Sequence, residues 1–315
     1  MNPTPVRPRA AVDRTTLRCV ICLLLMTHAL RLPAITFTLV PEADTTLFET
    51  FPGNNMGGVQ TVASGVTANG FKSRALFRFD IAGNIPSNAV ITSASLTLKV
   101  VMVPLGGGIN SDFALHRAER DWGEGNKVQG DPVTSTGAAA TAGEATWLAR
   151  FHPLSLWTAP GAAAPADYAP APTTTQFVSG LGTYTFTSLA ADVQAWLTNS
   201  AGNFGWILIS QREDPVTDAG TARRFGSRES VTNAPVLVVE CTICPEITIA
   251  EFSGNQFKIG FEAQAGHAYV VECRDSFSVP GWTMCTNLPP PAVTGPIEVL
   301  LPITGPVQFY RVGAQ

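Results

Sequence analysis

Alternation of apolar and polar residues is the main pattern along the chain, and the stretch 73–81, SRALFRFDI, shows it clearly. Successive side chains of a β-strand point to opposite faces, so this stretch is predicted to be a strand with two different faces. The apolar face consists of Ala75, Phe77, Phe79 and Ile81. The other face carries Arg74, Leu76, Arg78 and Asp80. This second face suits either structural ion pairs or a platform for an acidic ligand.

Eight further segments are short runs rich in β-branched and aromatic residues, mostly separated by Gly, Pro, Asn or Asp. These predicted strands are 35–40, 59–64, 89–103, 112–118, 145–150, 182–188, 204–210 and 235–240. One helix is predicted over 188–200, where apolar residues recur at helical spacing. Many short strands with a single short helix predict an all-β fold, a jelly-roll β-sandwich.

The segment 123–181 differs from the rest because Gly, Ala, Pro and Thr dominate it on both sides of the predicted strand 145–150. Such stretches bury little apolar surface of their own. They are therefore predicted to be long surface loops, either functional or mobile.

The first 34 residues have the pattern of a secretory signal peptide. Arginines precede the apolar run 19–30, which is shorter than the roughly 20 residues needed to span a bilayer, and RLPA follows with a predicted cleavage after Ala34. The protein is therefore predicted to be secreted, without membrane insertion after cleavage. A short uncleaved membrane anchor is the alternative.

Removal of residues 1–34 takes five arginines and one aspartate from the 20 basic and 24 acidic residues, which leaves a net charge of about −8. So acidic a protein is a poor partner for nucleic acid or anionic lipid.

Four cysteines remain after the predicted cleavage, and an oxidising compartment favours disulfides between them. The favoured pair is Cys273 with Cys285, whereas Cys241 and Cys244 could close a small ring or hold a metal. The composition also changes after Glu240. The predicted organisation is a signal peptide (1–34), a jelly-roll domain (35–240), a linker (241–246) and a small Ig-like or fibronectin-like β-sandwich (247–315).

Five stretches in order carry a resemblance: PEADTTLFE, SRALFRFDIAGNIPSNAVITSASLTL, ERDWGEG with AGEATWLAR, ADVQAWLTNSAGNFGWIL, and TARRFGSRESVTNAPVLVV. Together they cover about residues 41–240 and resemble the successive blocks of DNRLRE-domain proteins, which are related to carbohydrate-binding module family 96. The resemblance implies a secreted jelly roll that binds polysaccharide or serves as a cell-surface module. Residues 247–315 are more loosely similar to the short Ig-like modules that end in FYRV in exported bacterial proteins.

Catalysis is not expected. His116, His152 and His267 are the histidines left after the predicted cleavage, and no GxSxG or HExxH motif surrounds them. Paired carboxylates for glycoside cleavage remain a third interpretation, through the acids near Trp122. These acids are Glu119, Asp121, Glu124 and Glu144.

The composition favours binding over catalysis, because the planar guanidinium group of arginine forms bidentate hydrogen bonds with carboxylates such as those of uronic acids. The predicted ligand contacts are Lys72, Arg74, Arg223, Arg224, Asn54 and Asn55. Arg78 and Glu229 are assigned mainly to structure. If Arg74 and Arg224 contact ligand, changing either to alanine weakens retention and leaves the melting temperature nearly unchanged.

Calcium is the expected cofactor, in a structural role, with Glu42 and Asp44 as hard carboxylate ligands, although no EF-hand loop pattern is present. The predicted function is noncatalytic binding of an extracellular polysaccharide, with an acidic polymer as one candidate. The alternative is a structural or adhesion protein of the bacterial cell surface or matrix. The sequence names no protein partner.

Overall fold

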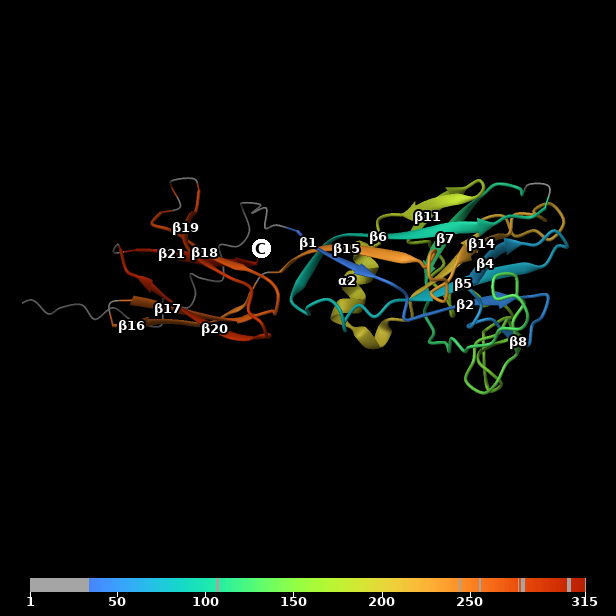
Figure 1. Cartoon of the computed structure of the whole chain (residues 1–315), viewed down its shortest axis with the longest axis horizontal. Helices are drawn as coiled ribbons and strands as arrows, with labels where there is room; N and C mark the ends of the chain where they lie inside the picture. Colours follow the sequence, from blue (N-terminus) through green and yellow to red (C-terminus); the bar gives the residue numbers. More distant parts are fainter. Residues whose placement is uncertain are drawn as a thin grey trace, which may run out of the picture. The chain divides into compact units, whose positions relative to one another are not determined.

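The computed structural model describes residues 34–105, 108–243, 245–254, 256–276, 278, 281–304 and 307–314. The regular secondary structure of the described residues is almost entirely β-strand, with one α-helix, α2 (Ala190–Thr198), followed by the 3₁₀ turn η1 (Ser200–Gly202) (Figure 1). This confirms the predicted all-β fold. No described helix has the length and apolar content needed to cross a membrane. The predicted signal segment, apart from Ala34, lies outside the described residues.

One antiparallel sheet of the N-terminal sandwich contains six strands. They are β1 (Ile35–Leu39), β15 (Val236–Ile243), β6 (Ala89–Met102), β12 (Gly182–Phe186), β14 (Arg223–Gly226) and β4 (Thr61–Val66). β6 is long enough to pair with β12 on one side and, successively along its length, with both β15 and β14 on the other. β15 continues through Cys241 to Ile243 because these residues pair with β6, so the predicted linker at 241–246 begins inside a strand.

The second sheet contains five strands, all antiparallel to their neighbours. They are β2 (Ala43–Phe48), β5 (Lys72–Arg78), β13 (Trp206–Ser210), β7 (Ser111–Arg117) and β11 (Thr174–Val178). β4 joins the two sheets: it pairs with β14 as far as Ser64 and with β5 from Gly65 onward. Gly65 has a φ of 105°, a conformation that favours glycine, and this allows the strand to turn from one sheet to the other.

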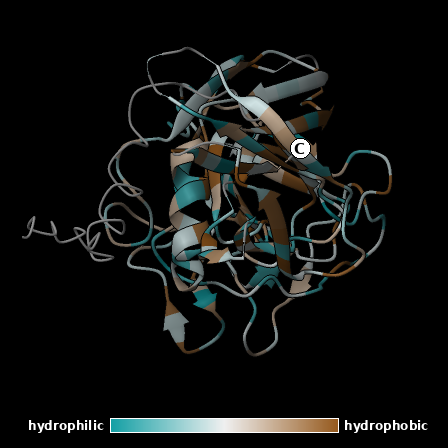
Figure 2. Cartoon of the chain, turned by 90° about the vertical axis from the view of Figure 1, so that its left-hand side faces the viewer, coloured by the Kyte–Doolittle hydropathy of each residue, from teal (hydrophilic) through white to brown (hydrophobic). Residues whose placement is uncertain are grey.

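The two sheets enclose the main apolar core. The Phe113 ring of β7 meets the Phe225 ring of β14, with centroids 5.7 Å apart, and Phe77 of β5 is fully buried. α2 lies along β6 and buries the predicted apolar stripe, on which Trp196 packs against Trp206 at a centroid distance of 4.5 Å. In Figure 2 the strands carry most of the hydrophobic colour, while the helix shows both hydrophilic and hydrophobic residues.

The outer face of the second sheet is covered rather than open. Residues from the segment 119–170 pack on this face and form a second apolar cluster with it. The cluster contains Trp122, Trp147, Trp157, Ala145 and Ala162 from the segment, and Ala43, Leu47, Leu76, Ile207 and Ile209 from the strands. The three tryptophans supply the apolar area that the Gly- and Ala-rich composition lacks, and two short strand pairs add order. The pairs are β9 (Ala149–Phe151) with β10 (Ser155–Leu156), and β3 (Asn54–Asn55) with β8 (Ala138–Ala139).

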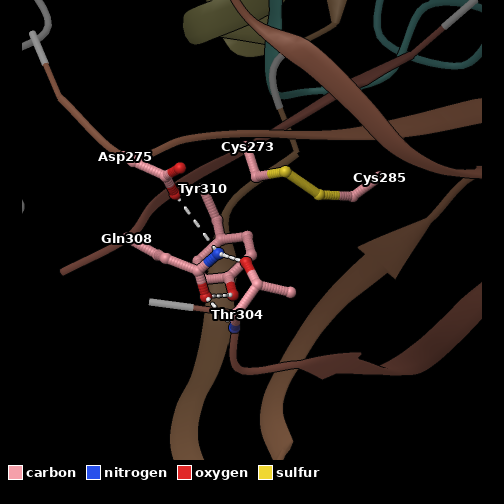
Figure 3. The surroundings of a disulfide bond; sticks show 6 residues. All are labelled: Cys273, Asp275, Cys285, Thr304, Gln308 and Tyr310. Carbon is pink, nitrogen blue, oxygen red and sulfur yellow. Dashed lines mark hydrogen bonds between the residues drawn. A yellow bond between two sulfur atoms is a disulfide. The ribbon is translucent and has the colours of Figure 1, made fainter. Parts of the chain in front are cut away.

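The C-terminal region contains two three-stranded antiparallel sheets. One consists of β16 (Ile247–Ser253), β17 (Gln256–Ala263) and β20 (Gly295–Pro302); the other of β19 (Thr283–Leu288), β18 (Tyr269–Arg274) and β21 (Phe309–Ala314). The predicted disulfide between Cys273 and Cys285 is present and links β18 to β19, with Cα atoms 5.9 Å apart (Figure 3). Cys241 is buried with a free thiol, and Cys244 lies outside the described residues.

Candidate functional site

Arg74, a predicted ligand contact, is engaged inside the fold. Its Nε and Nη2 lie 3.0 and 2.5 Å from the carboxylate of Glu213, and its Nη1 donates to the carbonyls of Gly161 and Ala162. The side chains of Arg74 and Glu213 are only 12% and 15% exposed. Arg74 therefore links β5 to the segment 119–170, which is the covering segment of the second sheet.

Arg78, which the sequence assigned mainly to structure, pairs with two carboxylates. Its Nε lies 2.7 Å from Glu42 and its Nη1 lies 2.8 Å from Asp121, while the guanidinium stands over the Trp122 ring at 5.1 Å. This pairing engages Glu42, one of the two carboxylates predicted to bind calcium. The polar face of β5, with Arg74, Leu76 and Arg78, thus lies beneath the segment 119–170, whereas Asp80 lies beyond the strand and is exposed.

Arg223 and Arg224, neighbours on β14, have partners of a different kind. Arg223 is fully buried, and its Nη atoms donate mainly to backbone carbonyls, among them those of Ile109 and Ser179. Arg224 donates to Thr61 Oγ1 at 2.9 Å and to carbonyls of residues 133–135. Within the described chain neither arginine forms an ion pair with a carboxylate. Burial lowers the pKa of both guanidinium groups.

A cavity of about 200 Å³ opens beside Arg224. Its walls are amide, hydroxyl and valine side chains from β4, β6 and three loop segments, without an ionisable group. They are Gln60, Thr61, Val101, Val133, Ser230, Val231, Thr232 and Asn233. Thr61 and Val133 belong to this wall and also accept hydrogen bonds from Arg224. The charge of Arg224 therefore lies directly behind a neutral polar wall, and no carboxylate of the described residues pairs with it.

The remaining predicted ligand contacts are mostly internal. Asn55 is fully buried: its Nδ2 donates to the carbonyls of Glu124 and Ala145, and its Oδ1 accepts from backbone N–H groups. Asn54 donates to the carbonyl of Thr136 at 3.1 Å. Lys72 is half-buried at the start of β5, and its backbone N–H donates to Glu49. The two asparagines hold the loop containing residue 124 and the 134–139 turn in place.

Asp44 belongs to a cluster of three carboxylates with Glu124 and Glu229, whose oxygens lie within 4.8 Å of one another. Arg228 Nε is 2.6 Å from Glu124 and 3.0 Å from Glu229, and its backbone N–H donates to Asp44 at 2.7 Å. The backbone N–H of Asp44 donates to Glu124 at 2.7 Å, whereas the buried Oε2 of Glu229 has no hydrogen-bond partner. One arginine thus faces three carboxylates.

Burial, together with the excess of negative charge, raises the pKa values of carboxyl groups in this cluster. Burial, followed by the nearby Glu229 carboxylate, raises the pKa of Asp44 well above its ordinary value. Burial also raises the pKa of Glu124, from 4.5 to about 6, against the opposing effect of its hydrogen bond from Asp44. The cluster consequently favours either a shared proton or a bound cation.

The pKa of Glu124 predicts a pH dependence of stability. Between its ordinary value and about 6, the folded protein binds more protons than the unfolded chain, so the free energy of unfolding falls as the pH rises through this window. Glu124→Gln is expected to remove this decrease in the free energy of unfolding, which is worth about 2 kcal/mol. The variant should therefore be more stable than the wild type near neutral pH and similar to it near pH 4. Urea unfolding near pH 7 and near pH 4 measures the difference, with Glu240→Gln, at an exposed glutamate, as the control. An unchanged pH slope in Glu124→Gln would contradict the assignment.

The other acids near Trp122 are dispersed among different partners. Glu119 pairs with Arg117 and Glu144 with Lys127, while Asp121 bonds Arg78 as described. Glu124 alone among the four joins the carboxylate cluster. The grouping of Asp44 with Glu124 and Glu229 could not be found by spacing, because 80 residues separate Asp44 from Glu124.

Comparison with known proteins gives no relative from sequence: no family model and no curated protein matches the chain. Among solved structures, the chain is similar to the glycoside hydrolase domain of Endo-D from Streptococcus pneumoniae R6, at 10% sequence identity and a TM-score of 0.15. The match covers 89% of this chain and 34% of that structure, so the chain spans about a third of its length. A similarity this low carries no argument about function, and the resemblance to DNRLRE-domain proteins stays a prediction.

Proposed function

We propose that the protein is exported and binds an acidic polysaccharide noncatalytically, at the cavity beside Arg224. The observation that carries this proposal is the pair of arginines on β14 without a carboxylate partner in the described chain, one of them directly behind the cavity wall. A carboxylated sugar in the cavity would lie in the positive field of Arg224, whose own side chain is largely buried behind the wall. Amide and hydroxyl groups of the wall suit sugar hydroxyls.

The size of the cavity limits the contact to a small part of a polymer. At about 200 Å³ it is smaller than the roughly 300–1,000 Å³ typical of sites for drug-sized ligands, so it suits about one sugar unit. The chain on either side of that unit would lie on the surface, and affinity for a single sugar is expected to be low.

A charge change at Val231, which lines the cavity and is 96% exposed, tests the proposal. In native gels containing alginate or polygalacturonate, the wild type is expected to migrate more slowly than in neutral glucans. Val231→Asp should abolish the retardation and Val231→Lys should keep it. Val216→Asp, at an 84% exposed valine that does not line the cavity, adds the same charge and should change nothing. Equal loss in both aspartate variants would place binding elsewhere.

The alternative function is an extracellular structural or adhesion protein, in which the sandwich adheres to other chains. Unchanged migration of the wild type in every polymer would favour this alternative. Reducing ends or unsaturated sugars released from the polymer would instead indicate a lyase or glycosidase.

Calcium binding at Asp44, Glu124 and Glu229 is a second proposal, supported by the uncompensated charge of this cluster. Arg228 already contacts two of the carboxylates, so a cation would compete with it. Calcium at 100 times its dissociation constant is expected to raise the free energy of unfolding by about 2.7 kcal/mol near neutral pH. Glu229→Gln should remove the shift and Glu240→Gln should not. No shift in the wild type would mean that a proton balances the cluster.

A further inference from the structure

The C-terminal region leaves one strand with an open edge. β16 pairs with β17 on one side, and within the described chain no strand pairs with its other side. Six of its seven residues are exposed and Ile249 is half-buried. An open edge presents a row of unpaired N–H and C=O groups, which is a template for a further strand.

β16 also lacks proline and lysine, two of the residues that most often protect an edge. β20, at the opposite edge of the same sheet, contains Pro296 and Pro302, whereas β16 contains neither proline nor lysine. Its one charged residue, Glu251, is neutralised by Lys258 of β17, with Nζ 2.8 Å from the carboxylate. A register shift is confined to the start of the strand, between Ile247 and Ile249.

The apolar content of β16 adds a reason for pairing. Phe252 is 67% exposed, and its ring meets Phe257 of β17 edge-on at a centroid distance of 5.5 Å. Phe257 in turn stacks on Tyr310 of β21 at 5.1 Å. A strand placed beside β16 would cover Phe252 and extend this row of packed aromatic rings.

We propose that β16 pairs antiparallel with β16 of a second copy of this chain, which joins their two sheets into one. Pairing centred on Ala250 places Phe252 opposite Thr248 of the other copy, and aromatic residues opposite β-branched ones stabilise antiparallel pairs. It also places Glu251 opposite Ile249, so no carboxylate directly faces another. Parallel, in-register pairing would bring the two Glu251 side chains together. The two copies would therefore be related by a two-fold axis, with β16 of each copy forming the same half of the interface.

Sedimentation equilibrium of the purified protein tests the proposal across a concentration series. The wild type is expected to reach twice the mass of the chain, and Phe252→Lys and Ala250→Lys should each halve this mass by placing a lysine in the seam. Leu300→Lys, at a half-exposed position on β20, adds the same charge at the opposite edge and should leave the dimer intact.

Amide hydrogen exchange identifies the contact itself. Backbone N–H groups of 249–253 are expected to exchange more slowly as the wild-type concentration rises, and to lose this dependence in both β16 variants. A wild type that stays monomeric at every concentration overturns the proposal. A dimer that persists in both β16 variants also overturns it. So does a Leu300→Lys variant that dissociates as fully as the β16 variants. None of these outcomes depends on whether the protein binds polysaccharide.

Discussion

Replacing Arg74 with alanine is expected to lower the free energy of unfolding by about 3–5 kcal/mol. The change leaves the Glu213 carboxylate, only 15% exposed, without its cation, and it leaves the carbonyls of Gly161 and Ala162 without a donor. Removing one partner of a buried ion pair costs more than the pair contributes, because the remaining charge stays buried and uncompensated. Urea unfolding followed by tryptophan fluorescence measures the loss.

Arg120→Ala provides the matched control, because Arg120 is exposed. Among the described residues its side chain donates one hydrogen bond, from Nε to the carbonyl of Ala166 at 3.2 Å. It removes the same charge and is expected to cost less than about 1 kcal/mol. The sequence-based hypothesis for Arg74 required nearly unchanged stability and weaker retention by polysaccharide. If Arg74→Ala had nearly unchanged stability and weaker retention, Arg74 would be a ligand contact instead of a structural residue.

Replacing Trp147 with alanine is the second large effect, again about 3–5 kcal/mol. Trp147 is 5% exposed in the cluster between the segment 119–170 and the second sheet, and its carbonyl accepts from the Gly161 N–H at 2.6 Å. The lost ring leaves a cavity that the surrounding residues fill only in part. The covering segment should therefore open more often, which limited proteolysis detects as faster cleavage within 119–170.

Leu154→Ala is the control for this change, since Leu154 belongs to the same segment but is 91% exposed. It is expected to alter stability by no more than about 0.5 kcal/mol and to leave the cleavage rate unchanged. If Trp147→Ala were cleaved at the wild-type rate, the covering segment would not depend on this cluster.

Local patterns predicted the elements well where one residue type repeats at the period of a strand or helix. The alternation in SRALFRFDI identified a strand whose Ala75 and Phe77 are fully buried, and the helical stripe identified α2 with Trp196 inside. The spacing of Cys273 and Cys285 agreed with their disulfide. These features depend on neighbours close in the chain, or on an even set of cysteines, so the sequence contains the information needed.

The role of each arginine depended on distant residues. Arg74 meets Glu213 across 139 residues, and Arg224 meets Thr61 across 163. Both are arginines on β-strands, yet among the described residues a carboxylate pairs with Arg74 and none pairs with Arg224. The composition of 123–181 also suggested loose loops, because an average over many small residues hides Trp147 and Trp157, which pack on the sheet with Trp122.

The sequence by itself determined the all-β class, the strand faces, the helix and the favoured disulfide, because each follows from short-range periodicity or from the chemistry of a few residues. Only the tertiary structure decided that the polar face of β5 lies beneath the segment 119–170 and that Asp44 joins Glu124 and Glu229 rather than Glu42. It also decided that Arg224 lies behind a cavity, with no counter-ion in the part of the chain that the structure describes. The physical reason is that charge compensation and burial are set by which distant segments meet in space, and the one-dimensional pattern does not specify those meetings.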